Sequence, residues 1–354
     1  MVRSASFAGR AKVLGAFAVS LSLSLAAFAA SAVRAEESGT ASPASEKTAS
    51  VEAPARVLSA GGAVTEIVYA LGAGERLIAA DVTSLYPEEA KDLPKVGYFR
   101  QLAAEPIVAM DPDLLLVVED AGPEDVLRQL KAAGMNIVTV PDETSPAGVL
   151  QKIGAVGAAL GLQEEAKALE AKIARRFDAL ETLIADAKEA PRVVILLSAG
   201  RGAPLAGGAE SSADAMIKLA GGTNAFSEFE NWKPVSAESL IAAAPDVIVV
   251  PSHVAEAMGG KDKVLEIAGV AETPAGRERR FVMMDSLLLL GFGPRTPEAA
   301  QITRLSQDGH CVDRADARDG RQQLIVRQAG QEFDGSGLNL IALSDQAAAF
   351  GENE

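Results

Sequence analysis

The sequence predicts an α/β protein with two Rossmann-like lobes, joined by a single long α-helix and facing each other across a ligand cleft. Short apolar segments alternate with helical segments over residues 55–145 and again over residues 191–300. Strands that alternate with helices are typical of a parallel sheet. Between these stretches, residues 146–190 show helical periodicity alone. The third observation is an internal repeat, in which residues 105–117 resemble residues 238–250, 133 positions later.

The N-terminal lobe, residues 55–145, contains the clearest strand signal. Leu114 to Val118 is a continuous apolar run behind Pro112-Asp113, as expected of a strand buried on both faces. Glycines follow the helical segments and mark their ends. The pattern predicts strands at 56–59, 77–80, 114–118 and 136–140, and helices at 64–71 and 126–133.

The connecting segment, residues 146–190, contains two predicted helices. Val149, Ile153, Val156 and Leu160 share one helical face, and Gly161 interrupts the pattern. The second helix runs from about residue 164 to 187, which makes it about 36 Å long at 1.5 Å per residue. It is long enough to bridge two lobes.

The C-terminal lobe, residues 191–300, repeats the alternation. Strands are predicted at 193–197 and 246–250, and a helix at 213–219. In both halves of the repeat a short helix begins at or near a Glu, a Pro-Asp pair ends it, and a buried strand follows. Two similar lobes would place a cleft between them, and such clefts are preferred ligand sites.

The N-terminus is typical of an exported protein. Arg3, Arg10 and Lys12 precede an apolar run from 13 to 30, and small residues before Glu36 fit cleavage after Ala35. Residues 1–35 are therefore predicted to be a signal peptide, and the small, polar residues 36–54 a flexible linker. Removing four basic residues takes the net charge from −15 to −19. A chain this acidic is not expected to bind nucleic acid.

Known catalytic motifs are absent from the sequence. It contains no G-x-x-x-x-G-K-[ST] loop, no G-x-S-x-G elbow and no H-E-x-x-H. Two His and one Cys exclude a disulfide framework and a Cys-rich zinc site. The sequence favours a binding protein over an enzyme, and an exported enzyme that uses His253 is the alternative.

The loop at 95–102 carries unusual chemistry, with Tyr98, Phe99 and Arg100 in a chain that has only three Tyr. A phenolate is a hard anionic oxygen donor that suits ferric iron. Arg100 is a permanent cation that would favour the anion. The alternative is a Tyr packed at the edge of a lobe beside an exposed Arg, and the residues alone favour that alternative.

Four segments, at 56–72, 96–117, 212–226 and 289–300, resemble the haem-binding periplasmic proteins of ABC importers, within a wider family that carries cobalamin and ferric siderophores. The resemblance covers about residues 55–300. It implies that Tyr98 is the axial ligand of haem iron and that Arg100 supports the phenolate. It also implies that Glu105 and Glu238, one on each lobe, dock onto Arg residues of the permease.

The resemblance further implies ferric haem b as cargo, an ABC permease dimer with its ATPase as partner, and an outer-membrane haem receptor upstream. A ferric siderophore or a corrinoid is the alternative cargo. Some relatives add a His after the first strand of the second lobe, but residues 198–202 contain none, so five-coordinate haem is expected with His253 as a fallback ligand. Arg201 and Arg295 are candidates for propionate contacts. Glu66 is expected to be a helix N-terminal charge.

The last 54 residues, 301–354, depart from the family pattern. They contain no Lys and hold the only Cys, Cys311. We expect a shifted reading frame or an aberrant extension in place of the last family helix. A genuine accessory tail is the alternative.

Overall fold

The computed structural model describes residues 53–185, 190–198, 203–307, 310–316, 322–328 and 339–342. Every described residue belongs to one compact unit, which lies within Glu52–Glu354. The predicted signal peptide and nearly all of the predicted linker lie outside the described residues. Within the described ranges, no helix combines the length and the apolarity needed to cross a membrane.

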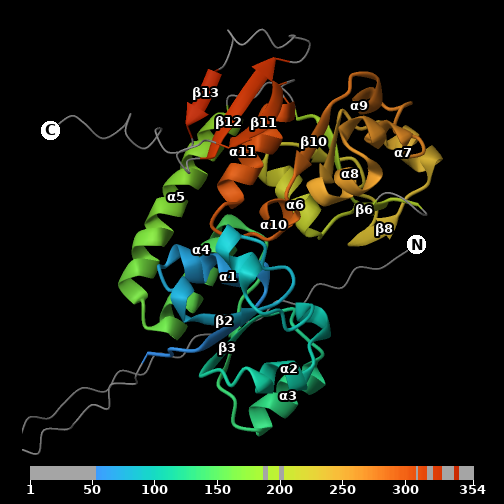
Figure 1. Ribbon diagram of the computed structural model, residues 1–354. Coiled ribbons are helices and arrows are strands. Elements are labelled where there is room, and N and C mark those ends of the chain that lie inside the picture. Colours follow the sequence, from blue (N-terminus) through green and yellow to red (C-terminus); the bar gives the residue numbers. More distant parts are fainter. Residues whose placement is uncertain are drawn as a thin grey trace, which may run out of the picture. The chain divides into compact units, whose positions relative to one another are not determined.

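The first part of the described chain forms a parallel four-stranded sheet (Figure 1). Its strands are β1 (Val57–Ala60), β2 (Leu77–Ala80), β3 (Leu114–Val118) and β4 (Ile137–Val140), in the order β2-β1-β3-β4. All four predicted strands are confirmed, and β2 and β3 have the predicted bounds because each is a short apolar run between turns. The helices are α1 (Gly62–Ala70), α2 (Ala104–Ala109) and α3 (Glu124–Ala132), with 3-10 helices η1 (Gly74–Arg76), η2 (Glu88–Asp92) and η3 (Phe99–Gln101).

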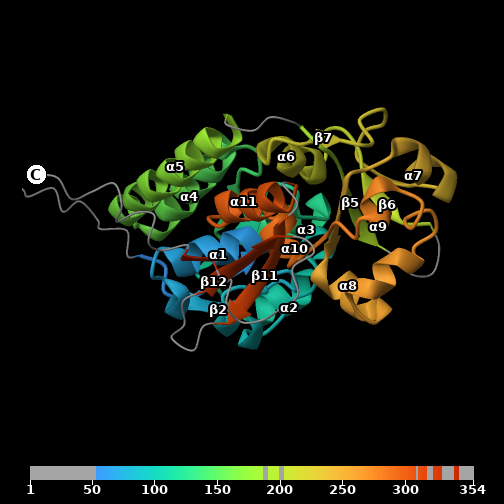
Figure 2. The same ribbon diagram turned by 90° about the horizontal axis from the view of Figure 1, so that it is seen from above.

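Two helices follow, α4 (Pro146–Leu160) and α5 (Gln163–Ala185), and they lie side by side in both views (Figures 1 and 2). Ser145 caps α4 by accepting a hydrogen bond from the Gly148 N–H, and Pro146 occupies the first helical position. Gly161 ends α4 at a φ of 73°, in the left-handed region that glycine favours. The predicted long helix is α5.

The second sheet has the path β10-β9-β5-β6-β8, with β7 paired to β5. Its central strands are parallel as predicted, but β6 pairs antiparallel with both β5 and β8. Strands β6 and β8 are only three residues long, which is too short to give a signal in the sequence. The strands are β5 (Arg192–Ser198), β6 (Leu205–Gly207), β7 (Thr223–Asn224), β8 (Trp232–Pro234), β9 (Val247–Pro251) and β10 (Phe281–Met284). The helices are α6 (Ser212–Leu219), α7 (Ala237–Ala243), α8 (Ser252–Met258), η4 (Lys261–Glu266), α9 (Pro274–Arg277) and α10 (Ser286–Leu290).

The internal repeat is visible in the topology. In the first sheet β3 lies between β1 and β4, and in the second β9 lies between β5 and β10, with all these pairs parallel. A short helix leads into the middle strand in each case, α2 into β3 and α7 into β9. The repeat predicted from residues 105–117 and 238–250 therefore corresponds to equivalent places in the two sheets.

One hydrophobic cluster connects the two sheets. It includes Val57 of β1, Phe177 of α5 and Val193 of β5. The next residue on each of these two strands, Leu58 on β1 and Val194 on β5, belongs to a different cluster. This alternation is expected because successive strand side chains point to opposite faces. Separating the sheets would expose part of the shared cluster to water, so the fold opposes large movements of one lobe against the other.

The last helix, α11 (Thr296–Gln307), crosses the predicted lobe boundary at residue 300. It buries Ile302, Thr303 and Arg304 and contacts α5. Residues 301–307 are therefore helical, and the atypical tail expected over residues 301–354 stays a prediction. The tail also contains an antiparallel sheet that the sequence did not predict, formed by β11 (His310–Asp316), β12 (Gln322–Gln328) and β13 (Asn339–Ala342).

Candidate functional site

Tyr98 lies in a loop that is held at the carboxyl ends of β2 and β3. The Val82 N–H donates to the Gly97 carbonyl at 2.9 Å, and Gly97 has a φ of 104°, which suits glycine. On the other side, Leu102 and Gly122 fix the loop against the segment that follows β3, since the Leu102 N–H donates to the Gly122 carbonyl at 2.8 Å. The carboxyl ends of parallel strands are where ligands bind in open α/β sheets.

Arg100 makes contact with the hydroxyl of Tyr98. Its Nη1 donates to Tyr98 Oη at 2.8 Å, and its Cζ lies 4.3 Å from the centre of the Phe99 ring. Burial disfavours the Arg100 charge, but hydrogen bonds to Asp120 and Tyr98 outweigh it and raise the pKa of Arg100. The contact is a charge-assisted hydrogen bond that fixes the position of the Tyr98 oxygen.

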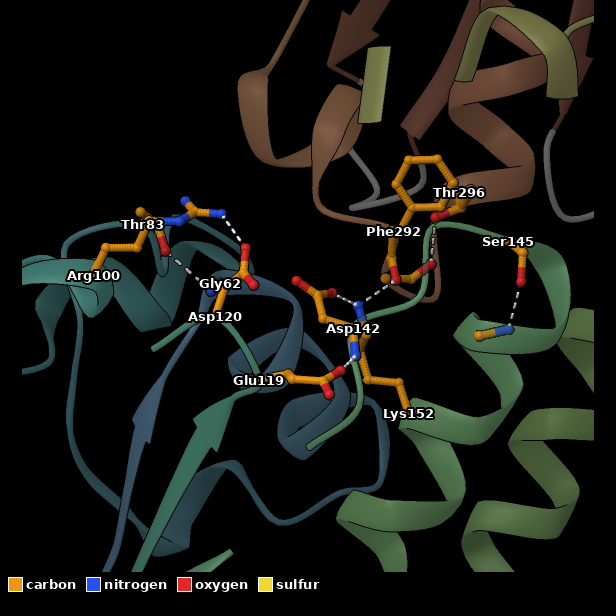
Figure 3. A network of polar contacts seen from close by, with 12 residues as sticks. Gly62, Thr83, Arg100, Glu119, Asp120, Asp142, Ser145, Lys152, Phe292 and Thr296 are labelled. Carbon is orange, nitrogen blue, oxygen red and sulfur yellow. Dashed lines mark hydrogen bonds and ion pairs between the residues drawn. The ribbon is translucent and has the colours of Figure 1, made fainter. Parts of the chain in front are cut away.

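Asp120, which the sequence reasoning missed, holds the other side of the guanidinium. Its Oδ2 accepts from Arg100 Nη2 at 2.8 Å (Figure 3). Asp120 comes two residues after β3, whereas Arg100 precedes α2, so only the fold brings the two together. The sequence signal that could have indicated Asp120 is the pair of acidic residues Glu119-Asp120 directly after a buried strand. The result is a chain of contacts from Asp120 through Arg100 to Tyr98.

Two exposed apolar side chains lie in the segment next to the Tyr98 loop. Val82 is 46% exposed and Leu85 is 38% exposed, while most large aliphatic side chains in the described part are buried. The backbone hydrogen bond from Val82 to Gly97 keeps this segment beside Tyr98. Exposed apolar side chains next to a polar group are typical of a ligand-binding surface.

A buried polar network fixes the backbone that carries Val82 and Leu85. The Asp81 carboxylate accepts hydrogen bonds from the Gly61 N–H at 3.0 Å and from the Ser84 hydroxyl at 2.9 Å. The Gly62 N–H donates to Thr83 Oγ1 at 3.0 Å (Figure 3). A Cβ on Gly62 would meet the Thr83 carbonyl oxygen at 2.5 Å, so this close approach requires glycine.

Arg295 is buried and bound to Glu66, which corrects the expectation for Glu66. Its Nη2 lies 2.8 Å from Glu66 Oε2, its backbone N–H donates to the same carboxylate at 3.2 Å, and its Cζ lies 3.4 Å from the centre of the Tyr86 ring. Glu66 is not a helix N-terminal charge, because α1 begins at Gly62 and Glu66 is only 3% exposed. The propionate contact of Arg295 stays a prediction, but its guanidinium already has a buried partner.

A second buried cation lies near the loop before α11, the loop that carries Arg295. Lys152 of α4 is fully buried, forms an ion pair with Asp142 and donates to the Phe292 carbonyl at 3.2 Å (Figure 3). The Asp142 N–H in turn donates to Glu119 at 3.3 Å. Burial raises the pKa of the Asp142 carboxyl, and Lys152 opposes that effect. These contacts connect α4, the end of β4 and the loop before α11.

Three of the remaining predicted site residues are exposed on separate helices. Glu105 and Glu238 are exposed in the first turns of α2 and α7. His253 is exposed at the start of α8, and Arg201 lies outside the described residues.

Comparisons with known proteins show what this chain resembles. Residues 57–288 match the family model described as periplasmic binding protein. The periplasmic heme-binding protein RhuT from Roseiflexus sp. RS-1, in apo form, is 38% identical with a TM-score of 0.69, over 71% of this chain and 97% of that one. The periplasmic heme-binding protein BhuT in complex with two hemes is 39% identical with a TM-score of 0.68, over the same shares.

The name of a more distant relative gives a different ligand, vitamin B12. The vitamin B12-binding protein of Photorhabdus laumondii is 28% identical over 213 residues, which is 60% of this chain and 74% of that protein. The family model covers well over half of the chain, and both solved structures match it over nearly their whole length. The chain therefore belongs to the periplasmic binding protein family.

Proposed function

We propose that this protein captures ferric haem b in the periplasm and delivers it to the permease of an ABC importer. The observation that carries the proposal is the hydrogen bond between Arg100 and Tyr98 Oη at 2.8 Å. It prepares a hard oxygen donor for ferric iron. Val82 and Leu85 provide an exposed apolar surface for a flat porphyrin beside that donor.

Tyr98 is the axial ligand in this proposal, and Arg100 and Asp120 hold its oxygen in place. The two heme-binding relatives at 38% and 39% identity support haem as the cargo. The iron is expected to be five-coordinate, since residues 198–202 supply no His and His253 is exposed at the start of α8.

The remaining parts of the proposal concern transport. Cleavage after Ala35 would release the chain into the periplasm, downstream of an outer-membrane haem receptor. Glu105 and Glu238 would dock onto cationic residues of the permease dimer, which its ATPase drives. The protein acts by binding and release of a solute, without catalysis.

A parallel titration with three ligands tests the cargo. The purified protein is titrated with ferric haem, cobalamin and a ferric siderophore, and tryptophan fluorescence and the optical spectrum are recorded. Ferric haem is expected to bind at least about 100-fold more tightly than the other two, which corresponds to about 2.7 kcal/mol. Preferential binding of cobalamin or the siderophore would overturn the proposal.

Asp120→Asn is expected to weaken ferric haem binding about 10- to 100-fold, because partners that orient a metal ligand typically contribute this much to metal affinity. Asp125→Asn removes another exposed carboxylate, one that pairs with Arg128 on α3, and it should leave haem affinity unchanged. In a Tyr98→Phe background, Asp120→Asn should add little further loss, because its effect passes through Tyr98. Equal effects of the two Asp variants would refute this positioning role.

A further inference from the structure

Two exposed aliphatic side chains occupy the same position in the internal repeat. Among the described residues, the large exposed hydrophobic side chains are Val82, Leu85, Val108, Leu183, Ile241 and Met283. Val108 is 53% exposed and lies three residues after Glu105, and Ile241 is 41% exposed and lies three residues after Glu238. Residues three apart on a helix are neighbours on one face. Each helix therefore presents a carboxylate and an aliphatic side chain together.

The requirements of the core do not explain these exposed side chains. The preceding residue of each helix, Ile107 in α2 and Leu240 in α7, is fully buried and anchors the helix to its lobe. Val108 and Ile241 point to solvent at equivalent places, since α2 leads into β3 and α7 leads into β9. Burial of a Val or Ile side chain typically stabilises a complex, whereas its exposure in the free protein serves no folding purpose.

The two carboxylates are available to a cationic partner. Within the described part of the chain, neither Glu105 nor Glu238 forms an ion pair with a Lys or Arg. The Glu238 backbone N–H and the Ser236 hydroxyl lower the pKa of the Glu238 carboxyl, which keeps it charged. Isolated exposed charges steer association but contribute little affinity once salt screens them.

We propose that Glu105 with Val108, and Glu238 with Ile241, form two equivalent docking surfaces for a partner that presents two equivalent sites, each a cationic side chain beside an apolar recess. This inference rests on the proposed function, in which that partner is the permease dimer. The carboxylates accelerate and orient the encounter, and the aliphatic side chains supply the part of the affinity that salt does not remove.

Binding of the haem-loaded protein to the permease–ATPase complex in lipid nanodiscs tests this inference, at low salt and at high salt. The variants are Val108→Gln, Ile241→Gln and the double substitution, because Gln retains helix propensity. Each single change is expected to weaken binding about threefold to tenfold, and the double change about 10- to 100-fold, at both salt concentrations. Glu105→Gln with Glu238→Gln should weaken binding mainly at low salt.

Leu183→Gln on α5 is the matched control, since Leu183 is 36% exposed and lies outside the repeat. It should leave permease binding unchanged, and all variants should bind haem as the wild type does. The inference would be overturned if the double variant bound the permease as tightly as the wild type. It would also be overturned if the substitutions changed only the self-association of the carrier. Failure of the wild type to bind haem would instead overturn the proposed function.

Discussion

Tyr98→Phe is expected to lower the affinity for ferric haem by more than about 100-fold, since loss of a direct iron ligand should exceed the effect of losing a supporting partner. The phenylalanine ring can keep the edge-on contact with Phe99, whose ring centre lies 4.8 Å away. Arg100 keeps its ion pair with Asp120, so the loop should retain its shape. An optical titration of the purified variant with ferric haem gives the affinity.

The matched control is Tyr69→Phe, which removes a hydroxyl from a half-buried Tyr of α1. Its haem affinity and spectrum should be those of the wild type. A Tyr98→Phe variant with haem affinity within threefold of the wild type would contradict the ligand assignment.

Glu66→Ala is expected to lower the free energy of unfolding by about 3–5 kcal/mol, because it leaves the Arg295 charge buried without its partner. Arg295 Nε already has no hydrogen-bond partner, and the Tyr86 ring beside the guanidinium does not replace the hydrogen bonds that Glu66 accepts. Burial raises the pKa of the Glu66 carboxyl, and Arg295 opposes this effect. Urea unfolding followed by circular dichroism measures the change.

Two further variants separate a buried ion pair from a general loss of charge. Glu66→Leu combined with Arg295→Met removes both charges and should destabilise the protein less than Glu66→Ala alone. Glu88→Ala breaks an exposed pair with Lys91 and should lower the free energy of unfolding far less than Glu66→Ala does. If Glu66→Ala lowers the free energy of unfolding no more than Glu88→Ala does, the Glu66–Arg295 pair does not connect α1 to the loop before α11 in solution.

The sequence could predict local features of the fold because they depend on neighbouring residues. The strand at 114–118 is a continuous apolar run, and Tyr98 and Arg100 are only two residues apart. By contrast, β6 is three residues long and ends at Gly207, so its antiparallel pairing left no periodic pattern.

Contacts that depend on packing could not be predicted. Glu66 and Arg295 are 229 residues apart, and their ion pair exists only because α1 and the loop before α11 meet. Similarly, Ile107 and Val108 are both aliphatic, and only the packing of α2 decides that the first is buried and the second exposed. The continuation of α11 to Gln307, with Ile302 buried, likewise depends on packing that the sequence pattern did not show.

The crystal structure of the ferric haem complex tests the central claim most directly. We predict a bond between Tyr98 Oη and the haem iron, with Arg100 still donating to that oxygen and the porphyrin beside Val82 and Leu85. No second axial protein ligand is expected. A haem whose iron is bound by another residue, or one bound away from the Tyr98 loop, would contradict the account.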